Sequence, residues 1–187
     1  MTRKRFVFDP PDRFVAGTVG EPGHRTFFLQ ARDGRRVVSV VLEKTQVAVL
    51  AERLGSLLFE LDRRGITKTA DAAAATDTSP LDEPLQEAFR AGTLTLGWDG
   101  GSERVLIEAR AMTDEDEEPD DEPAVEADDD EDGPDLFRVR ISADAARAFV
   151  DRAMRVVGAG RPPCPLCGQP LDPGGHICPR RNGHYVH

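Results

Sequence analysis

An internal repeat restricts the fold of this chain more than any other feature of its sequence. The pentapeptide Phe14-Val-Ala-Gly-Thr18 returns as Phe89-Arg-Ala-Gly-Thr93. Two further blocks recur in the same order, Phe28–Arg32 as Leu106–Arg110 and Val40–Leu42 as Val139–Ile141. Self-similarity of this kind indicates that one supersecondary unit occurs twice. The distance between the copies grows sharply only before the last block, so we interpret the stretch in front of that block as an insertion.

The insertion spans residues 113–135 and is strongly acidic, with fifteen Asp or Glu and no Lys or Arg. It sets the formal charge of −10, and the rest of the chain is mildly basic. Because like charges repel and few apolar side chains are present, such a run cannot bury enough surface to offset the entropy of ordering. We therefore predict a disordered, solubilising insertion. The alternative is that the insertion attracts a basic partner electrostatically or mimics nucleic acid.

Each copy has the pattern of three strands. Glycine-rich turns separate short runs of β-branched and aromatic residues, which predicts a hairpin and then a third strand in each copy. The expected strands are Gly17–Val19, Phe27–Ala31 and Arg36–Leu42 in the first copy, and Thr93–Leu96, Val105–Ala109 and Leu136–Ile141 in the second. Trp98 lies in the second hairpin turn, where we expect packing rather than ligand binding.

Apolar residues at helical spacing predict a helix after each third strand. They are Val47, Leu50, Leu54, Leu57 and Leu61 in the first copy, and Ala146, Phe149, Ala153 and Val156 in the second. Thr45 and Ser142 are the expected N-caps, and Gly65 and Gly158 are the expected stops beyond the last turns.

These elements predict a single α+β domain made of a duplicated β-β-β-α unit. Two antiparallel three-stranded sheets, each with one helix, are expected to meet about a pseudo-twofold axis, so that the apolar helix faces share one core. The predicted boundaries are 1–65 for the first repeat, 66–83 for an alanine-rich linker, 84–158 for the second repeat with its insertion, and 159–187 for a separate tail.

The tail concentrates residues that bind metals. All three cysteines of the chain, Cys164, Cys167 and Cys178, lie there together with three of the four histidines. The sequence Cys-Pro-x-Cys-Gly makes a tight turn whose backbone N–H groups point at both thiolates, as in a zinc-ribbon knuckle. Because the tail has few apolar residues, it needs bound metal to fold. We therefore predict a Zn²⁺ site in an element that lies outside the repeat.

A tetrahedral structural zinc takes four nitrogen or sulfur ligands. The expected ligands are Cys164, Cys167, His176 and Cys178. His184 is the alternative fourth ligand, and His187 is a more distant candidate because a terminal residue frays. Four candidate ligands in one tail favour a closed structural site over a catalytic site with an open water position. The remaining alternative is a set of free thiols with a redox role.

Three features extend the description over nearly the whole chain: the Phe-x-Ala-Gly-Thr starts, the acidic run before Phe137-Arg-Val-Arg-Ile141, and the tail segments Gly160–Gly168 and Gly175–Gly183. In these features the chain resembles an uncharacterised actinobacterial family of conserved hypothetical proteins with a cysteine-bearing, zinc-ribbon-like tail. The Gly-His-x-Cys-Pro-Arg element recurs in that family, which supports His176 as a ligand. The resemblance implies no activity.

An enzyme is one hypothesis for the function. The sequence has no phosphate loop, nucleophile elbow or paired-histidine motif. An enzyme of an unrecognised class would have to use carboxylates of the repeat body, such as Asp9, Asp12 and Glu43. That hypothesis requires these three side chains to share one cleft.

A nucleic-acid-binding regulator is a second hypothesis, since Arg161, Arg180 and Arg181 flank the cysteines. The acidic run would compete with nucleic acid for a basic face. We favour a third hypothesis, a non-enzymatic zinc-binding adaptor that binds another protein of unknown identity. It is preferred because the other two classes lack the residues that they need.

The N-terminus carries no recognisable targeting segment. The apolar stretch Phe6-Val-Phe8 is far shorter than the core of a signal peptide, and no later stretch approaches the length of a membrane span. We therefore expect a soluble, cytoplasmic protein without a membrane partner. Structural disulfides are not expected in that compartment.

Overall fold

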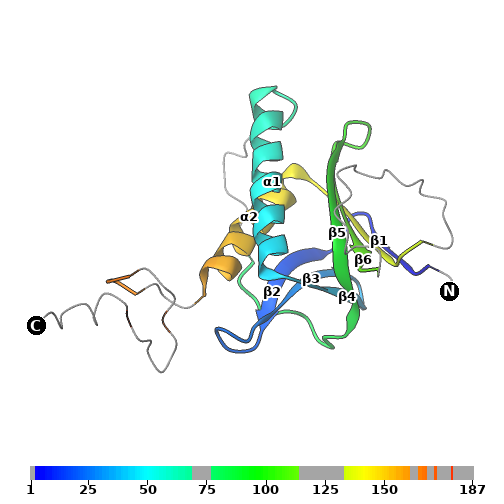
Figure 1. Ribbon diagram of the computed structural model, residues 1–187. Coiled ribbons are helices and arrows are strands. Elements are labelled where there is room, and N and C mark those ends of the chain that lie inside the picture. The colour runs from blue at the N-terminus through cyan, green and yellow to red at the C-terminus, as the bar shows by residue number, and fades with distance from the viewer. Residues whose placement is uncertain are drawn as a thin grey trace, which may run out of the picture.

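A computed structural model of the protein describes residues 3–68, 77–113, 133–160, 164–167, 171 and 178. In this part of the chain, seven strands and two helices form a mixed α+β fold, which confirms the predicted class (Figure 1). The elements are β1 (Arg5–Phe8), β2 (Arg13–Val19), β3 (Thr26–Asp33), β4 (Arg36–Leu42), α1 (Lys44–Arg63), β5 (Glu87–Asp99), β6 (Arg104–Ala111), β7 (Leu136–Ile141) and α2 (Ala143–Gly158). The alanines of the predicted linker and the acidic positions 114–132 lie outside the described residues.

One seven-stranded sheet replaces the two separate three-stranded sheets that we expected. Its strand order is β1-β7-β6-β5-β4-β3-β2. The physical reason is the length of β5, whose first residues pair in parallel with β4 while Leu94–Asp99 pair with β6. Strand β1, which was not predicted, adds a second parallel pair beside β7. The two halves therefore share backbone hydrogen bonds as well as a core.

Both helices pack on the same side of the curved sheet, in the angle between its β2–β4 part and its β5–β7 part (Figure 1). The alternation of apolar and polar residues along each strand explains this arrangement, because every second side chain points to the helices. One buried cluster contains Leu29, Val40, Ile107 and Val139 from the strands and Leu54 from α1.

The predicted core faces of the helices are largely confirmed. Four predicted residues of α1 and three of α2 are buried: Val47, Leu50, Leu54, Leu61, Ala146, Phe149 and Ala153. In α1, Leu58 is buried where Leu57 was predicted. Phe149 stacks on Phe14 of β2, with ring centroids 4.6 Å apart. Trp98 is partly buried against the same core, as expected.

The helix ends differ from the predictions at two positions. Ser142 caps α2 as predicted, because its hydroxyl accepts the Ala145 N–H. Helix α1 instead begins after Glu43, not Thr45, since Glu43 and Gln46 form a reciprocal capping box. Gly65 follows α1 with a φ of 70°, the left-handed conformation that favours glycine. Gly158 is the last residue of α2 rather than a stop beyond it.

The connector between the halves, residues 77–86, is held against the outer face of the sheet. The buried Gln30 amide binds both the N–H and the C=O of Asp82, and it also donates to the Ser39 hydroxyl. Arg13, whose side chain is 10% exposed, binds the carboxylates of Asp77 and Asp82. These contacts fix this part of the predicted linker on the first half.

Candidate metal centre

Three thiols come together in the described part of the tail. The Sγ atoms of Cys164, Cys167 and Cys178 all lie within 4.8 Å of one another. Those of Cys164 and Cys178 are 3.9 Å apart, and both residues are only 6% exposed. Among the described residues, this is the only group of His, Cys, Asp or Glu side chains close enough to hold a metal ion. The structure thus brings together the three cysteines that the sequence pattern singled out.

The turn at Cys164-Pro-Leu-Cys167 has the local geometry of a thiolate-binding loop. The Leu166 N–H donates to the Cys164 sulfur over 3.4 Å. Hydrogen bonds from the backbone of Cys167 and of Leu166 lower the pKa of the Cys164 thiol below its usual value. Since the thiolate is the form that binds a metal, this turn favours the ligand state of Cys164.

The spacing of the sulfurs fits a tetrahedral metal. With Zn–S bonds of about 2.3 Å, two ligands of a tetrahedral site lie about 3.8 Å apart. The Cys164–Cys178 separation of 3.9 Å is close to that value. The candidate nitrogen ligands His176, His184 and His187 lie outside the described residues.

The carboxylates that an enzyme would need do not share one site. Each has a different partner: Asp9 pairs with Arg104 and Arg140, Asp12 accepts the Gly34 N–H, and Glu43 pairs with Arg90. These contacts place the three acids at an edge of the sheet, in a turn and at a helix start. In the described part of the chain they do not form a group close enough to hold a metal ion.

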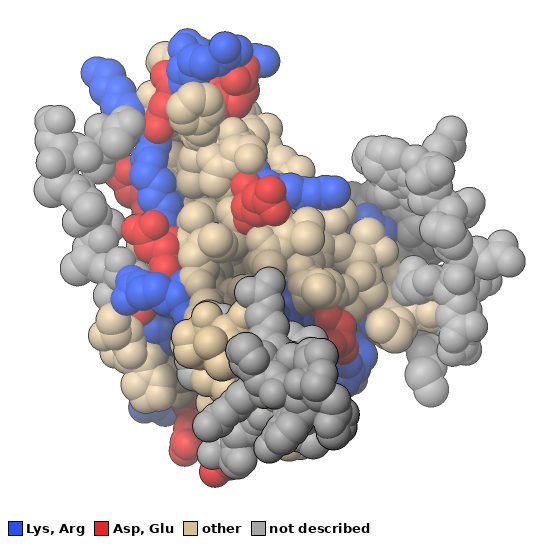
Figure 2. Space-filling view, turned by 60° about the vertical axis from the view of Figure 1, so that its left-hand side comes forward, with Lys and Arg blue, Asp and Glu red and all other residues tan. Residues whose placement is uncertain are grey.

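Charge on the visible helical face of the molecule is mixed. Figure 2 shows acidic side chains beside basic ones at the top, along the left margin and within the otherwise uncharged central area. Ion pairs of this kind occur at the end of α1, where Glu60 pairs with Arg63 and Arg64. Arg161, Arg180 and Arg181 lie outside the described residues. This face therefore shows no continuous basic stripe that would track a phosphate backbone.

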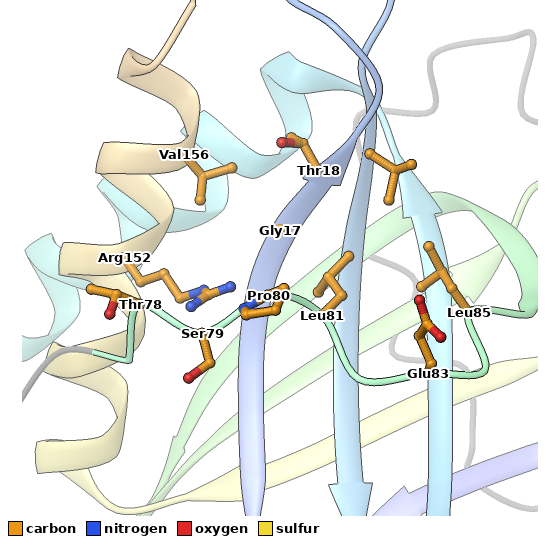
Figure 3. Close-up of a pocket in the computed structure, with 11 residues that line it drawn as sticks. Gly17, Thr18, Thr78, Ser79, Pro80, Leu81, Glu83, Leu85, Arg152 and Val156 are labelled. Carbon is orange, nitrogen blue, oxygen red and sulfur yellow. The ribbon is translucent and has the colours of Figure 1, made fainter.

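A shallow pocket of about 310 Å³ lies between β2, α2 and the connector (Figure 3). Its lining mixes the aliphatic side chains of Leu81, Leu85 and Val156 with hydroxyls and the Arg152 guanidinium. Arg152 is itself engaged, because it donates to the Ala16 carbonyl over 2.7 Å and to Asp77. The cation in this pocket therefore already has partners within the protein.

Sequence reasoning missed the buried polar side chains of the sheet. Gln30 and Glu108 are 1% and 5% exposed, and they occupy matching places in the two halves. Across the strand, Gln30 faces Ser39 and Glu108 faces Arg138. The sequence did contain a signal for these two residues, because both copies of the block Phe28–Arg32 have a polar residue at the same position between apolar ones.

Together, the fold and the site define an α+β protein with a C-terminal cysteine cluster that could bind a metal ion. The chain belongs to the family described as "Protein of unknown function (DUF3090)", whose model matches residues 6–178. That range includes all three cysteines. No curated protein and no solved structure matched the chain. The expected membership in a family without an assigned activity is confirmed, whereas the actinobacterial origin and the zinc-ribbon character of the tail stay predictions.

No helix in the described ranges combines the length and the apolar character that crossing a membrane requires.

Proposed function

We propose that this protein is a non-enzymatic, zinc-binding adaptor, in which the α+β body binds another protein and the metal orders the tail. The main support for zinc binding is that the Sγ atoms of Cys164, Cys167 and Cys178 lie within 4.8 Å of one another. Three thiolates are soft ligands that select zinc over magnesium or calcium, which take oxygen ligands.

The proposed fourth ligand is His176, with His184 as the alternative. In His176-Ile-Cys178 the histidine lies two positions before a cysteine of the cluster, and the preceding turn sequence Asp172-Pro-Gly-Gly175 would bring both back to the first two cysteines. With four protein ligands the coordination shell is closed, which suits a structural rather than a catalytic zinc. The burial of Cys164 and Cys178 supports the same reading, because a catalytic metal must stay open to its substrate.

The adaptor role is supported by how the charged side chains outside the cysteine cluster are already engaged within the protein. The carboxylates Asp9, Asp12 and Glu43 are each held by separate partners, and the one cation of the pocket, Arg152, is already bonded. A nucleic-acid-binding role is less well supported, because basic and acidic side chains alternate on the helical face. Binding of a protein partner needs none of the missing catalytic groups.

We further propose that the two β-β-β-α halves are copies of one unit related by a pseudo-twofold axis. Two parallel strand pairs support this proposal: β4 of the first half pairs with β5 of the second, and β7 of the second pairs with β1 of the first. In both cases the third strand of one unit, β4 or β7, pairs with the strand that begins the other half, β5 or β1.

Zinc content tests the metal site. We expect about one zinc per chain in the purified protein, measured by elemental analysis, and loss of that zinc in Cys164→Ser, Cys167→Ser and Cys178→Ser. His176→Ala should lose zinc while His184→Ala keeps it; the reverse result would assign His184. A metal-free wild-type protein, purified without chelator and under reducing conditions, would contradict the zinc proposal.

Co-purification from the native cell tests the adaptor role. A partner that is recovered with the tagged full chain, and identified by mass spectrometry, is the expected result. Recovery of the protein alone and monomeric would count against this role.

A further inference from the structure

The side of α1 that points away from the core carries a regular stripe of residues. Five exposed residues follow one another there in steps of three and four: Val49, Glu52, Ser56, Phe59 and Arg63. Such steps keep side chains on one side of a helix, and they are also the spacing of the contact positions in a coiled coil. We call these five residues the α1 stripe.

The apolar members of the α1 stripe are unusually open to solvent. Phe59 is 70% exposed, which makes it the most exposed large apolar side chain among the described residues, and Val49 is 44% exposed. A single exposed apolar residue is common on protein surfaces, so Phe59 alone indicates no contact. Its significance depends on the residues that lie beside it on the stripe.

The charged members of the α1 stripe have opposite signs. The exposed Glu52 makes no ion pair with any described residue. Arg63 lies about three turns further along the helix, and its side chain is 69% exposed. It shares the Glu60 carboxylate with Arg64, whose Nε lies closer to that group, at 2.7 Å against 3.0 Å. Because Arg64 still holds Glu60, Arg63 can turn to another acid.

Ser56 leaves room for an aromatic ring. Its side chain is small, and its hydroxyl already donates to the Glu52 backbone carbonyl over 3.0 Å. Burial of a polar group costs little when its hydrogen bond is kept. A ring can therefore cover Ser56 without leaving the hydroxyl unpaired.

The order of these residues is self-complementary for two antiparallel helices. Positions 52, 56, 59 and 63 are separated by four, three and four residues, and this spacing reads alike in both directions. Glu52 therefore lies opposite Arg63 of a second copy, and Ser56 lies opposite its Phe59. A twofold dimer requires a patch of this kind, because both copies use the same surface. We propose that the α1 stripe is the contact surface of a homodimer in which the two α1 helices pack antiparallel.

Phe59 lies beside the twofold axis in this arrangement. The axis passes midway between positions 52 and 63, so each Phe59 is about 2 Å from it along the helix, and the two rings can meet across a helix–helix distance of about 8–10 Å. Two Glu52–Arg63 pairs flank the rings. Because one helix per copy takes part, we expect an interface below about 1,200 Å² and a weak dimer. This inference goes beyond the adaptor role, since a dimer presents two copies of any partner-binding surface.

Sedimentation velocity of the full chain under reducing conditions tests the dimer, in a concentration series up to about 1 mM that includes weak complexes. We expect the mean mass to rise with concentration from that of one chain toward that of two. Phe59→Lys should raise the Kd of the dimer about tenfold or more. The matched control Val19→Lys changes a 48% exposed residue at the end of β2 and should leave the Kd unchanged.

Charge reversal identifies the second copy and its orientation. Glu52→Arg alone and Arg63→Glu alone should each raise the Kd about tenfold or more, because like charges then face each other across the axis. An equimolar mixture of these two variants should dimerise again, since every facing pair then joins an arginine to a glutamate. A contact with an unrelated protein does not predict this recovery.

Four results would overturn the proposal: a monomer at every concentration, equal effects of Phe59→Lys and Val19→Lys, a mixture that associates no better than its components, or loss of the dimer in Cys164→Ser. A different protein that co-purifies with a monomeric wild type but not with Phe59→Lys would assign the stripe to that protein instead. Circular dichroism checks that all variants are folded. Because the dimer is measured on purified protein without a partner, its failure is observed separately from failure of the zinc and adaptor proposals.

Discussion

The substitution Gly17→Ala tests how the connector, residues 77–86, packs on the sheet. A Cβ atom at this position would lie 2.6 Å from Cδ2 and 2.7 Å from Cγ of Leu81. Rotation about χ2 of Leu81 leaves Cγ in place, so the overlap is relieved only if χ1 of Leu81 changes or the connector backbone shifts. Gly17→Ala is therefore expected to destabilise the fold although Ala is intrinsically the better strand residue.

The magnitude follows from two opposing effects. Overpacking of this kind costs about 1–3 kcal/mol, and the lower entropy of the unfolded Ala chain returns about 0.4–1 kcal/mol. Gly97 of β5 provides a matched control, since a Cβ there would meet nothing within 4 Å. Gly97→Ala should therefore gain only the entropy contribution. The two variants are expected to differ by about 1–3 kcal/mol in the free energy of unfolding, at about 2–4 °C of Tm per kcal/mol.

Urea denaturation of the two variants measures this difference, and a double-mutant cycle identifies its cause. In a Leu81→Ala background the overlapping atoms are gone, so Gly17→Ala should have little effect. Equal stability of Gly17→Ala and Gly97→Ala would refute the packing of the connector described above. The same conclusion would follow if Leu81→Ala failed to relieve the effect of Gly17→Ala.

Three further predictions concern the core, the connector and the tail. Phe149→Ala removes a ring that stacks on Phe14 and should lower the free energy of unfolding by about 3–5 kcal/mol, measured by urea denaturation. The hydrogen bonds from Arg13 hold the pKa of the Asp77 carboxyl below its usual value. The ionised carboxylate therefore stabilises the fold fully above the unfolded pKa of about 4, and this contribution to the free energy of unfolding is lost as the pH falls below that value. Asp77→Asn should make the free energy of unfolding less dependent on pH in this acidic range. Removal of metal with a chelator, or Cys164→Ser, should leave the urea midpoint of the body unchanged, and unfolding of the body on metal loss would show that the tail packs into it.

Local patterns in the sequence predicted the elements well. The helical spacing of Val47, Leu50 and Leu54 in α1 depends only on which side of one helix faces the core, and these residues are buried. The turn Cys164–Cys167 likewise brings two of the three cysteines together locally, whereas the approach of Cys178 depends on a longer stretch of chain. Such features need information from a few neighbouring residues, and the sequence contains that information directly.

Pairing between the halves was not predictable in the same way. Whether β4 pairs with β5 depends on contacts between Ser39 and Glu87 or Val41 and Arg90, which no periodicity encodes. The Glu43–Gln46 capping box was also missed, because Thr45 is the stronger capping residue by type and only the actual backbone path decides between them. Long-range geometry therefore decides the features that local propensity leaves open.

The repeated Ala-Gly-Thr sequence has a structural use that links the two halves. Arg152 of α2, in the second half, donates to the carbonyl of Ala16 in the first copy of the motif over 2.7 Å. Gln46 of α1, in the first half, donates to the carbonyl of Ala91 in the second copy over 3.1 Å. Ala16 and Ala91 are both fully buried. Because each helix is bonded to the motif of the opposite half, neither half has a complete hydrogen-bond set alone, and these contacts stabilise the body as one unit.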